Sequence, residues 1–161
     1  SPKINKFKIK FKKLFSSIPK SSLVLISIGE IDCRLDSGII KFKKKNPNKN
    51  ISKIIFKVVE RYLNYISKIN LHIKHKVIIQ GVPCPNIEIK NIDDKEIKML
   101  VNVIKQFNII LREESYEMGF TFLDLYKLTD RGDGFSNKVW HIDQYHLSPK
   151  AMLKVWNNYT S

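Results

Sequence analysis

The chain of 161 residues contains only two cysteines, Cys33 and Cys84, which excludes a disulfide-stabilised scaffold. Neither cysteine has metal-ligand spacing. His72 and His75 lie three residues apart, but no second ligand pair completes a zinc pattern, so we expect both histidines in a surface loop. The sequence therefore predicts no metal ion and no cofactor.

Long apolar runs are also absent, and no segment reaches the length needed to cross a membrane. The basic start, SPKINKFKIKFKKLF, lacks the uninterrupted apolar core of a signal peptide, so any export signal would lie upstream. The compartment stays open on these grounds, with a cytoplasmic location slightly favoured. The oligomeric state stays open as well.

Arginine and N-terminal acidic residues are scarce, although the formal net charge is +14. Arginine, the better bidentate ligand for phosphate, occurs only at positions 34, 61, 112 and 131, and no Asp or Glu precedes Glu30. The abundance of Ile, Asn, Phe and Lys is typical of AT-rich coding. Nucleic acid is therefore not the expected partner, although a basic face that binds nucleic acid or an anionic surface remains one alternative.

The composition, 43% apolar and 11% aromatic, is that of one globular domain over residues 1–161. Apolar spacing predicts helices over residues 4–18 and 51–69. It also predicts a third helix that begins at the capping-box pair Asp93 and Glu96 and ends at Gly119. Ser148 and Pro149 begin a last helix. Residues 37–50 are expected to form a basic loop.

Three apolar segments, residues 22–29, 76–83 and 120–126, are predicted strands, and the first is expected to be buried on both faces. Strands that alternate with long helices predict an α/β fold in which helices cover both faces of a parallel sheet. Ligands of such sheets bind beyond the carboxyl ends of the strands. This rule brings GEIDCR (29–34), PCP (83–85) and the loop after Tyr126 to one rim.

The segment WHIDQYHLSP, residues 140–149, carries the chemistry. Asp143 and His146 lie three residues apart, just before the last helix. A carboxylate that accepts the proton of one imidazole nitrogen leaves the other nitrogen as a base. The alternative is a capping Asp and a partly buried His. The position on the predicted rim favours the base.

These segments resemble the SGNH (GDSL-type) hydrolases, a family of serine esterases and lipases. VLISIGEIDCR resembles the strand and Gly-x-Asn-Asp motif of the third family block, VIIQGVPCP the next strand, and DQYHLSP the Asp-x-x-His block. The resemblance covers about residues 5–158. It implies a flavodoxin-like three-layer α/β/α fold, with His146 as general base, Asp143 as its orienting carboxylate, and Gly29 and Asp32 in the frame of the third block.

Two departures from the family pattern stand out. Ile31 replaces the Asn that would donate a hydrogen bond to the oxyanion, and losing such a donor costs about 10²–10³ in rate. We expect Glu30, Asp32 and Arg34 to form a charge network on the rim, and Cys33 to serve in packing. Nothing in the chain matches the Gly-Asp-Ser block, so the nucleophile is unknown. The family's first two strands are then missing, and the sequence is that of an N-terminally truncated domain.

Three functions follow from the sequence. The first is an ester hydrolase that acts on an acyl ester, for example an O-acetylated carbohydrate, with its serine outside this chain. The second is a non-catalytic relative that binds glycan or serves in polysaccharide biosynthesis, which Ile31 supports. The third is the basic nucleic-acid or anionic-surface binder. The acyl group and the alcohol of a substrate are not readable from the loops.

Overall fold

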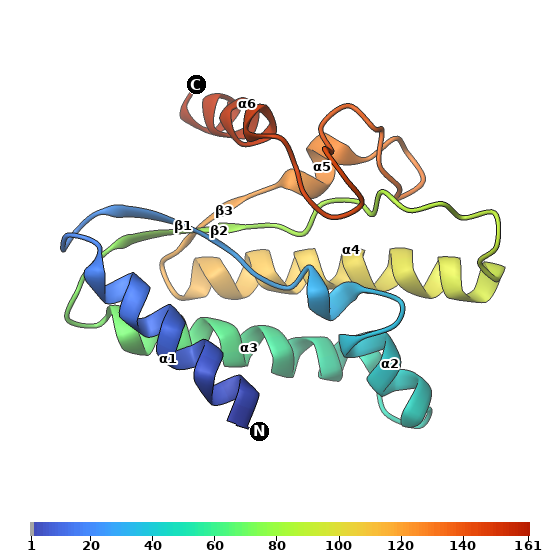
Figure 1. Ribbon diagram of the computed structural model, residues 1–161, viewed down its shortest axis with the longest axis horizontal. Coiled ribbons are helices and arrows are strands. Elements are labelled where there is room, and N and C mark those ends of the chain that lie inside the picture. The colour runs from blue at the N-terminus through green and yellow to red at the C-terminus, as the bar shows by residue number, and fades with distance from the viewer. Residues whose placement is uncertain (1) are drawn as a thin grey trace.

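A computed structural model describes residues 2–161 and shows helices and parallel strands in alternation (Figure 1). Its elements are α1 (Pro2–Ser17), β1 (Leu23–Ser27), the one-turn 3₁₀ helix η1 (Ile31–Cys33), α2 (Gly38–Lys45), α3 (Ile51–Asn70), β2 (Lys76–Gln80), α4 (Asp94–Glu117), β3 (Thr121–Leu123), α5 (Leu125–Thr129) and α6 (Pro149–Thr160). No helix among these residues is both long and apolar enough to span a bilayer.

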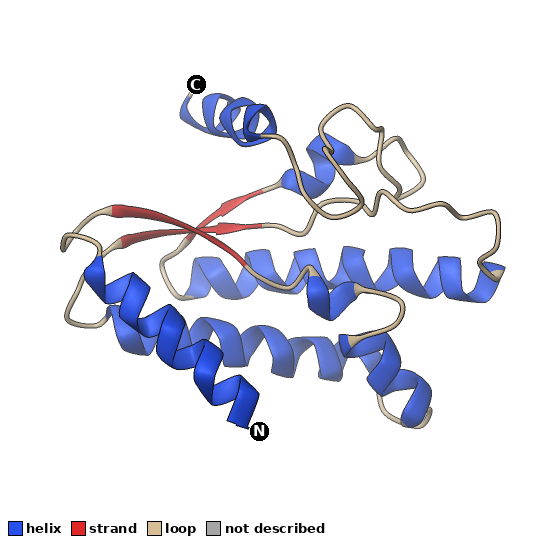
Figure 2. Ribbon diagram, in the orientation of Figure 1, coloured by secondary structure: helices blue, strands red, loops and turns tan. Residues whose placement is uncertain are grey.

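The strands form an all-parallel sheet in the order β1–β2–β3, with Leu25 paired to Ile78 and Ile78 to Thr121. α1, α3 and α4 lie on one side of the sheet, and α5 and α6 lie on the other (Figure 2). The fold is the predicted three-layer α/β/α arrangement, with a small, open sheet.

The main core lies between the sheet and α3 and α4. Alternate strand residues Ile26, Val77 and Ile79 point into it and meet the apolar faces of the two long helices, including Val59 and Phe107. The spacing of apolar residues in the helices therefore predicts which faces are buried.

The predicted helix ends agree with the structure. The side chain of Asp93 accepts a hydrogen bond from the backbone N–H of Lys95, and Gly119, with φ of +73°, follows the end of α4. Glu96, the second member of the predicted capping box, forms an ion pair with Lys44 instead. Pro149 occupies the first position of α6 as expected.

Strand β1 is not buried on both faces, contrary to the prediction. Leu23 is 56% exposed and Leu25 is 46% exposed, whereas Ile26 is buried. The reason is its position at the edge of the sheet, since α6 packs against β3, two strands away. One face of an apolar strand therefore remains open.

Three further predictions are corrected. Residues 37–50 are not all loop, because Ile39 and Ile40 are buried in the core and the segment forms α2. His75 is not on the surface: it is 5% exposed, and its ring binds the Ser22 N–H through Nδ1 and contacts the Phe15 carbonyl through Nε2. The last strand is short, because Asp124 caps α5 immediately after it.

Candidate active site

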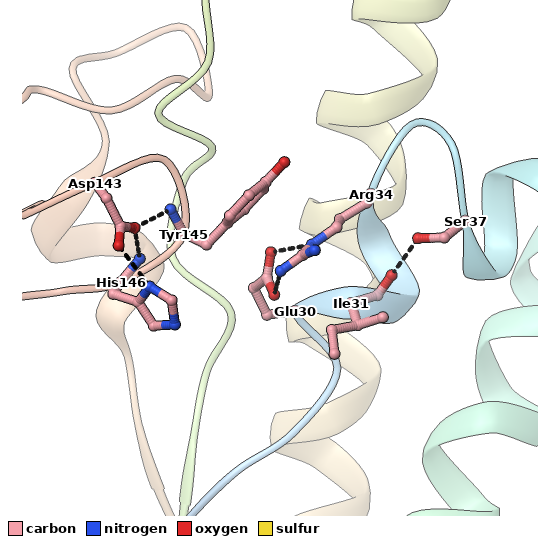
Figure 3. Close-up of polar contacts among 7 residues, drawn as sticks. All are labelled: Glu30, Ile31, Arg34, Ser37, Asp143, Tyr145 and His146. Carbon is pink, nitrogen blue, oxygen red and sulfur yellow. Dashed lines mark hydrogen bonds and ion pairs between the residues drawn. The ribbon is translucent and has the colours of Figure 1, made fainter. Parts of the chain in front are cut away.

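The loop before α6 holds the predicted acid–imidazole pair in contact. His146 Nδ1 lies 2.7 Å from Asp143 Oδ2, and the other carboxylate oxygen accepts the backbone N–H groups of Tyr145 and His146 (Figure 3). These contacts lower the pKa of Asp143 to about 2, the backbone hydrogen bond from Tyr145 being the largest cause. The carboxylate is ionised at neutral pH and accepts the Nδ1 proton, which leaves Nε2 as the basic nitrogen.

Backbone hydrogen bonds stabilise this loop. The N–H of Ile142 donates to the His146 carbonyl, and the N–H of Ser148 donates to the Trp140 carbonyl. The side-chain amide of Asn86, beyond the end of β2, donates to the Asp143 carbonyl at 3.0 Å. The loop that carries the pair is therefore joined to the rim formed by β2.

The turn after β1 supplies the facing side of the rim. Gly29 adopts a φ of +91°, which favours glycine, and a side chain here would also collide with the ring of Phe107. The chain can therefore turn from β1 directly into η1. Glu30 and Arg34 project from this turn toward the loop of Asp143 and His146 (Figure 3).

Arg34 joins the two sides of the rim. Its Nε and Nη2 atoms bind both oxygens of Glu30, at 2.8 and 2.7 Å, and its guanidinium lies 3.7 Å from the centre of the Tyr145 ring. The hydrogen bonds to Glu30 raise the pKa of Arg34 further above its ordinary value. Because Tyr145 is the neighbour of His146, this stack connects the imidazole loop to the β1 turn.

Asp32 does not belong to the predicted charge network. Its carboxylate accepts a hydrogen bond of 2.7 Å from the Tyr62 hydroxyl on α3, whereas Arg34 binds Glu30. Burial raises the pKa of Asp32 despite this bond. Ile31 is 64% exposed on the rim and brings no hydrogen-bond donor there in its side chain.

Both thiols are buried, and the burial of Cys33 agrees with its predicted packing role. Burial raises the pKa of Cys33 well above its ordinary value and the pKa of Cys84 to about 12. Since the thiolate is the reactive form, neither cysteine is suited to nucleophilic attack.

A cavity of about 160 Å³ lies between the two sides of the rim. Arg34 and Cys33 from the η1 turn, Pro83 and Cys84 after β2, and Tyr145 from the imidazole loop line it. The three segments placed near one another by the carboxyl-end rule thus contribute to one hollow.

The sequence offered no signal for a Ser136–His141 contact, whose histidine lines this cavity. Ser136, which is buried, lies 2.8 Å from His141 Nδ1, while Nε2 of His141 is buried without a hydrogen-bond partner. Burial lowers the pKa of His141 and so favours the neutral form of its ring. No spacing rule links a Ser and a His five residues apart in a loop.

Among residues 2–161 no group of three or more His, Cys, Asp or Glu side chains could hold a metal ion. Within the same range no serine hydroxyl is hydrogen-bonded to the His146 ring, which contacts Asp143.

Two solved structures are similar to this chain in their overall fold. The chain is similar to phospholipase A1 from Streptomyces albidoflavus NA297, with a TM-score of 0.50 and 15% identity over 88% of this chain and 71% of the other. It is also similar to an extracellular lipase from Streptomyces rimosus, with a TM-score of 0.52 and 15% identity over 87% and 70% of the two chains. The fold is lipase-like.

Sequence comparison adds nothing to this result. No protein-family model matches the chain, and no curated protein matches it. At 15% identity the structural likeness concerns the backbone arrangement alone.

Proposed function

We propose that the chain is part of an SGNH-type serine ester hydrolase in which His146 is the general base and Asp143 orients it. The observation that carries this proposal is the 2.7 Å contact between Asp143 Oδ2 and His146 Nδ1 on the rim beyond the carboxyl ends of the strands. In the reaction, Nε2 of His146 would take the proton of an attacking serine hydroxyl and return it to the leaving alcohol. The buried form of Cys33 supports its exclusion as the nucleophile.

The serine would come from a segment outside residues 1–161 that pairs with the free edge of β1. Leu23 and Leu25 leave this edge apolar and exposed, which folded proteins avoid. A strand added beside β1 would end next to the Gly29 turn, because the carboxyl ends of parallel strands meet at one edge. The proposal also treats residues 1–161 as one incomplete domain.

The proposed substrate is an ester whose acyl group is small enough to bind at the rim. An O-acetylated carbohydrate is one example. The cavity of about 160 Å³ is lined by Tyr145, the neighbour of His146, but not by His146 or Asp143, and its small volume with apolar residues after β2 supports a short acyl group. The structural neighbours are a phospholipase A1 and a lipase, and they support ester hydrolysis in general.

The deciding experiment joins residues 1–161 to the protein encoded immediately upstream and measures hydrolysis of a short-chain aryl ester. We expect a Gly-Asp-Ser segment there, and His146→Ala should lower kcat by at least about 10³-fold because the base is lost. A fluorophosphonate probe should label that serine. His72→Ala is the control, since His72 is exposed and lies in the turn before β2.

Two outcomes would contradict the proposal. One is full turnover in the His146→Ala protein. The other is labelling of a serine whose replacement leaves hydrolysis unchanged.

A second candidate is a non-catalytic relative that binds glycan. Ile31 favours it, because an exposed apolar side chain stands where the family resemblance expects an oxyanion donor. This candidate predicts no upstream nucleophile, no fluorophosphonate labelling and saturable glycan binding that protects the rim from hydrogen exchange.

A further inference from the structure

A second hollow lies between α2 and α3, outside the candidate active site. It is a groove of about 460 Å³, and four of its lining residues are cationic: Lys49, Lys53, Lys57 and Arg61. The last three are spaced four residues apart on α3, so their side chains follow one side of the helix at a rise of about 6 Å each. We call this the α2–α3 groove.

The 3₁₀ helix η1 separates this groove from the rim. Asp32 lines the α2–α3 groove, whereas its neighbours Cys33 and Arg34 line the cavity beside the imidazole loop. A ligand in the groove would therefore not displace Asp143 or His146.

The cations of the groove have no acidic partner among the described residues. None of the four forms an ion pair there, although Lys44 of the neighbouring helix α2 pairs with Glu96. The one acidic residue that lines the groove is Asp32, which accepts a hydrogen bond from the Tyr62 hydroxyl. The groove thus has four cationic groups against one carboxylate.

The floor of the groove is apolar, which a plain solvated row of lysines does not require. Phe42, Ile54 and Val58 line it, and Phe42 is 42% exposed. The ammonium of Lys49 lies 5.0 Å from the centre of the Phe42 ring. Cationic walls over an apolar floor fit a ligand with both an anionic group and an apolar part.

We propose that the α2–α3 groove binds the phosphate group of an anionic amphiphile, namely an acidic phospholipid such as phosphatidic acid. The lysines and Arg61 bind the phosphate oxygens, and the floor around Phe42 contacts the first carbons of the apolar part. This inference does not depend on the proposed esterase reaction.

Helix α1 indicates that the amphiphile lies in a bilayer. It packs against α3 one turn beyond Arg61, where the Tyr65 hydroxyl donates to the Lys8 carbonyl and the Lys8 ammonium lies over the Tyr65 ring. α1 contains no acidic residue, and Phe7 and Leu14, seven residues apart, are 74% and 65% exposed. A basic helix with exposed apolar residues is typical of binding at a membrane surface.

The test is flotation with phosphatidylcholine vesicles with and without phosphatidic acid. We expect binding only to vesicles with phosphatidic acid, weakened by added salt, and a loss of about tenfold in affinity in the double variant Lys53→Gln, Lys57→Gln. The matched control is Lys98→Gln, Lys105→Gln, which removes the same charge from exposed positions on α4 and should change affinity less than twofold.

A soluble arm identifies the ligand source. Dihexanoyl phosphatidic acid below its micellar concentration should shift the amide signals of Lys53 and Lys57 in an NMR titration, whereas Phe7→Ser with Leu14→Ser should weaken only the binding to vesicles. Equal losses in the groove and control variants would overturn the proposal, since net charge alone would then explain binding. Tighter, groove-dependent binding of a single-stranded oligonucleotide than of the amphiphile would also overturn it.

Discussion

Gly29 shows how one residue shapes the rim. It combines a positive φ with close packing against Phe107, a fully buried residue of α4. A side chain at this position would strain the backbone and push the aromatic ring out of the core. The turn that projects Glu30 and Arg34 therefore requires glycine.

Replacing Gly29 by Ala should destabilise the protein by about 2–4 kcal/mol, because backbone strain and overpacking act together. Gly132→Ala is the control: its φ is +120° but no atom would meet the added methyl group, so it should cost only about 1 kcal/mol. Urea unfolding followed by circular dichroism measures both. Equal losses in the two variants would show that packing against Phe107 does not matter.

Other residues acquire their role from neighbours that are distant in the chain. Asp32 and Arg34 are two positions apart, yet one contacts Tyr62 on α3 and the other contacts Glu30 and Tyr145. The spacing of charges predicted one network. The one-turn helix η1 separates them because successive side chains of a helix point in different directions.

At the scale of elements, the stack of Arg34 on Tyr145 joins the β1 turn to the loop before α6. The ion pair of Arg34 with Glu30 is only partly buried, so its own contribution to stability is small. The pair holds Arg34 against Tyr145, and this contact restrains the loop that contains His146.

Tyr145→Ala should therefore loosen this loop, with amide hydrogen exchange over residues 141–147 rising about fivefold, as expected for a loss of about 1 kcal/mol. Tyr145→Phe keeps the ring and should retain protection, which makes it the matched control. In the extended protein proposed above, the Ala variant should lose kcat more than KM. Equal exchange in all three proteins would show that the stack of Arg34 on Tyr145 does not restrain the loop.

At the scale of the whole molecule, the sheet is covered unevenly. α1, α3 and α4 bury one face, while α5 and α6 lie on the other side, with α6 packed against β3 (Figure 2). Because no helix of residues 2–161 covers this part of the sheet, the large apolar side chains of Leu23 and Leu25 are exposed on the edge strand β1. Such an edge favours pairing with another strand.

The 161-residue chain on its own should therefore self-associate as its concentration rises. Leu25→Lys should shift this association to at least about tenfold higher concentration, because a charge on an edge strand opposes strand pairing. The control is Ile109→Lys on α4, where the replaced side chain is similarly exposed, at 47%. Sedimentation velocity distinguishes the outcomes, and equal effects of both substitutions would argue against the β1 edge.

The lysines of the α2–α3 groove lie on α3 and in the loop before it, and only their arrangement around Phe42 distinguishes them from the other lysines of a chain with a net charge of +14. Composition alone suggested a diffuse basic surface.

The sequence alone determined the order of the three strands and of α1, α3, α4 and α6, the parallel sheet and the neighbourhood of Asp143 and His146, because apolar periodicity and short spacings are local properties of the chain. It did not determine that residues 38–45 are helical, that His75 is buried or that β1 is half exposed. Those outcomes depend on which surfaces meet: Ile39 and Ile40 find the core, Phe15 covers His75, and β1 lies at the edge of the sheet. Burial is a property of the assembled molecule, so the tertiary structure decided it.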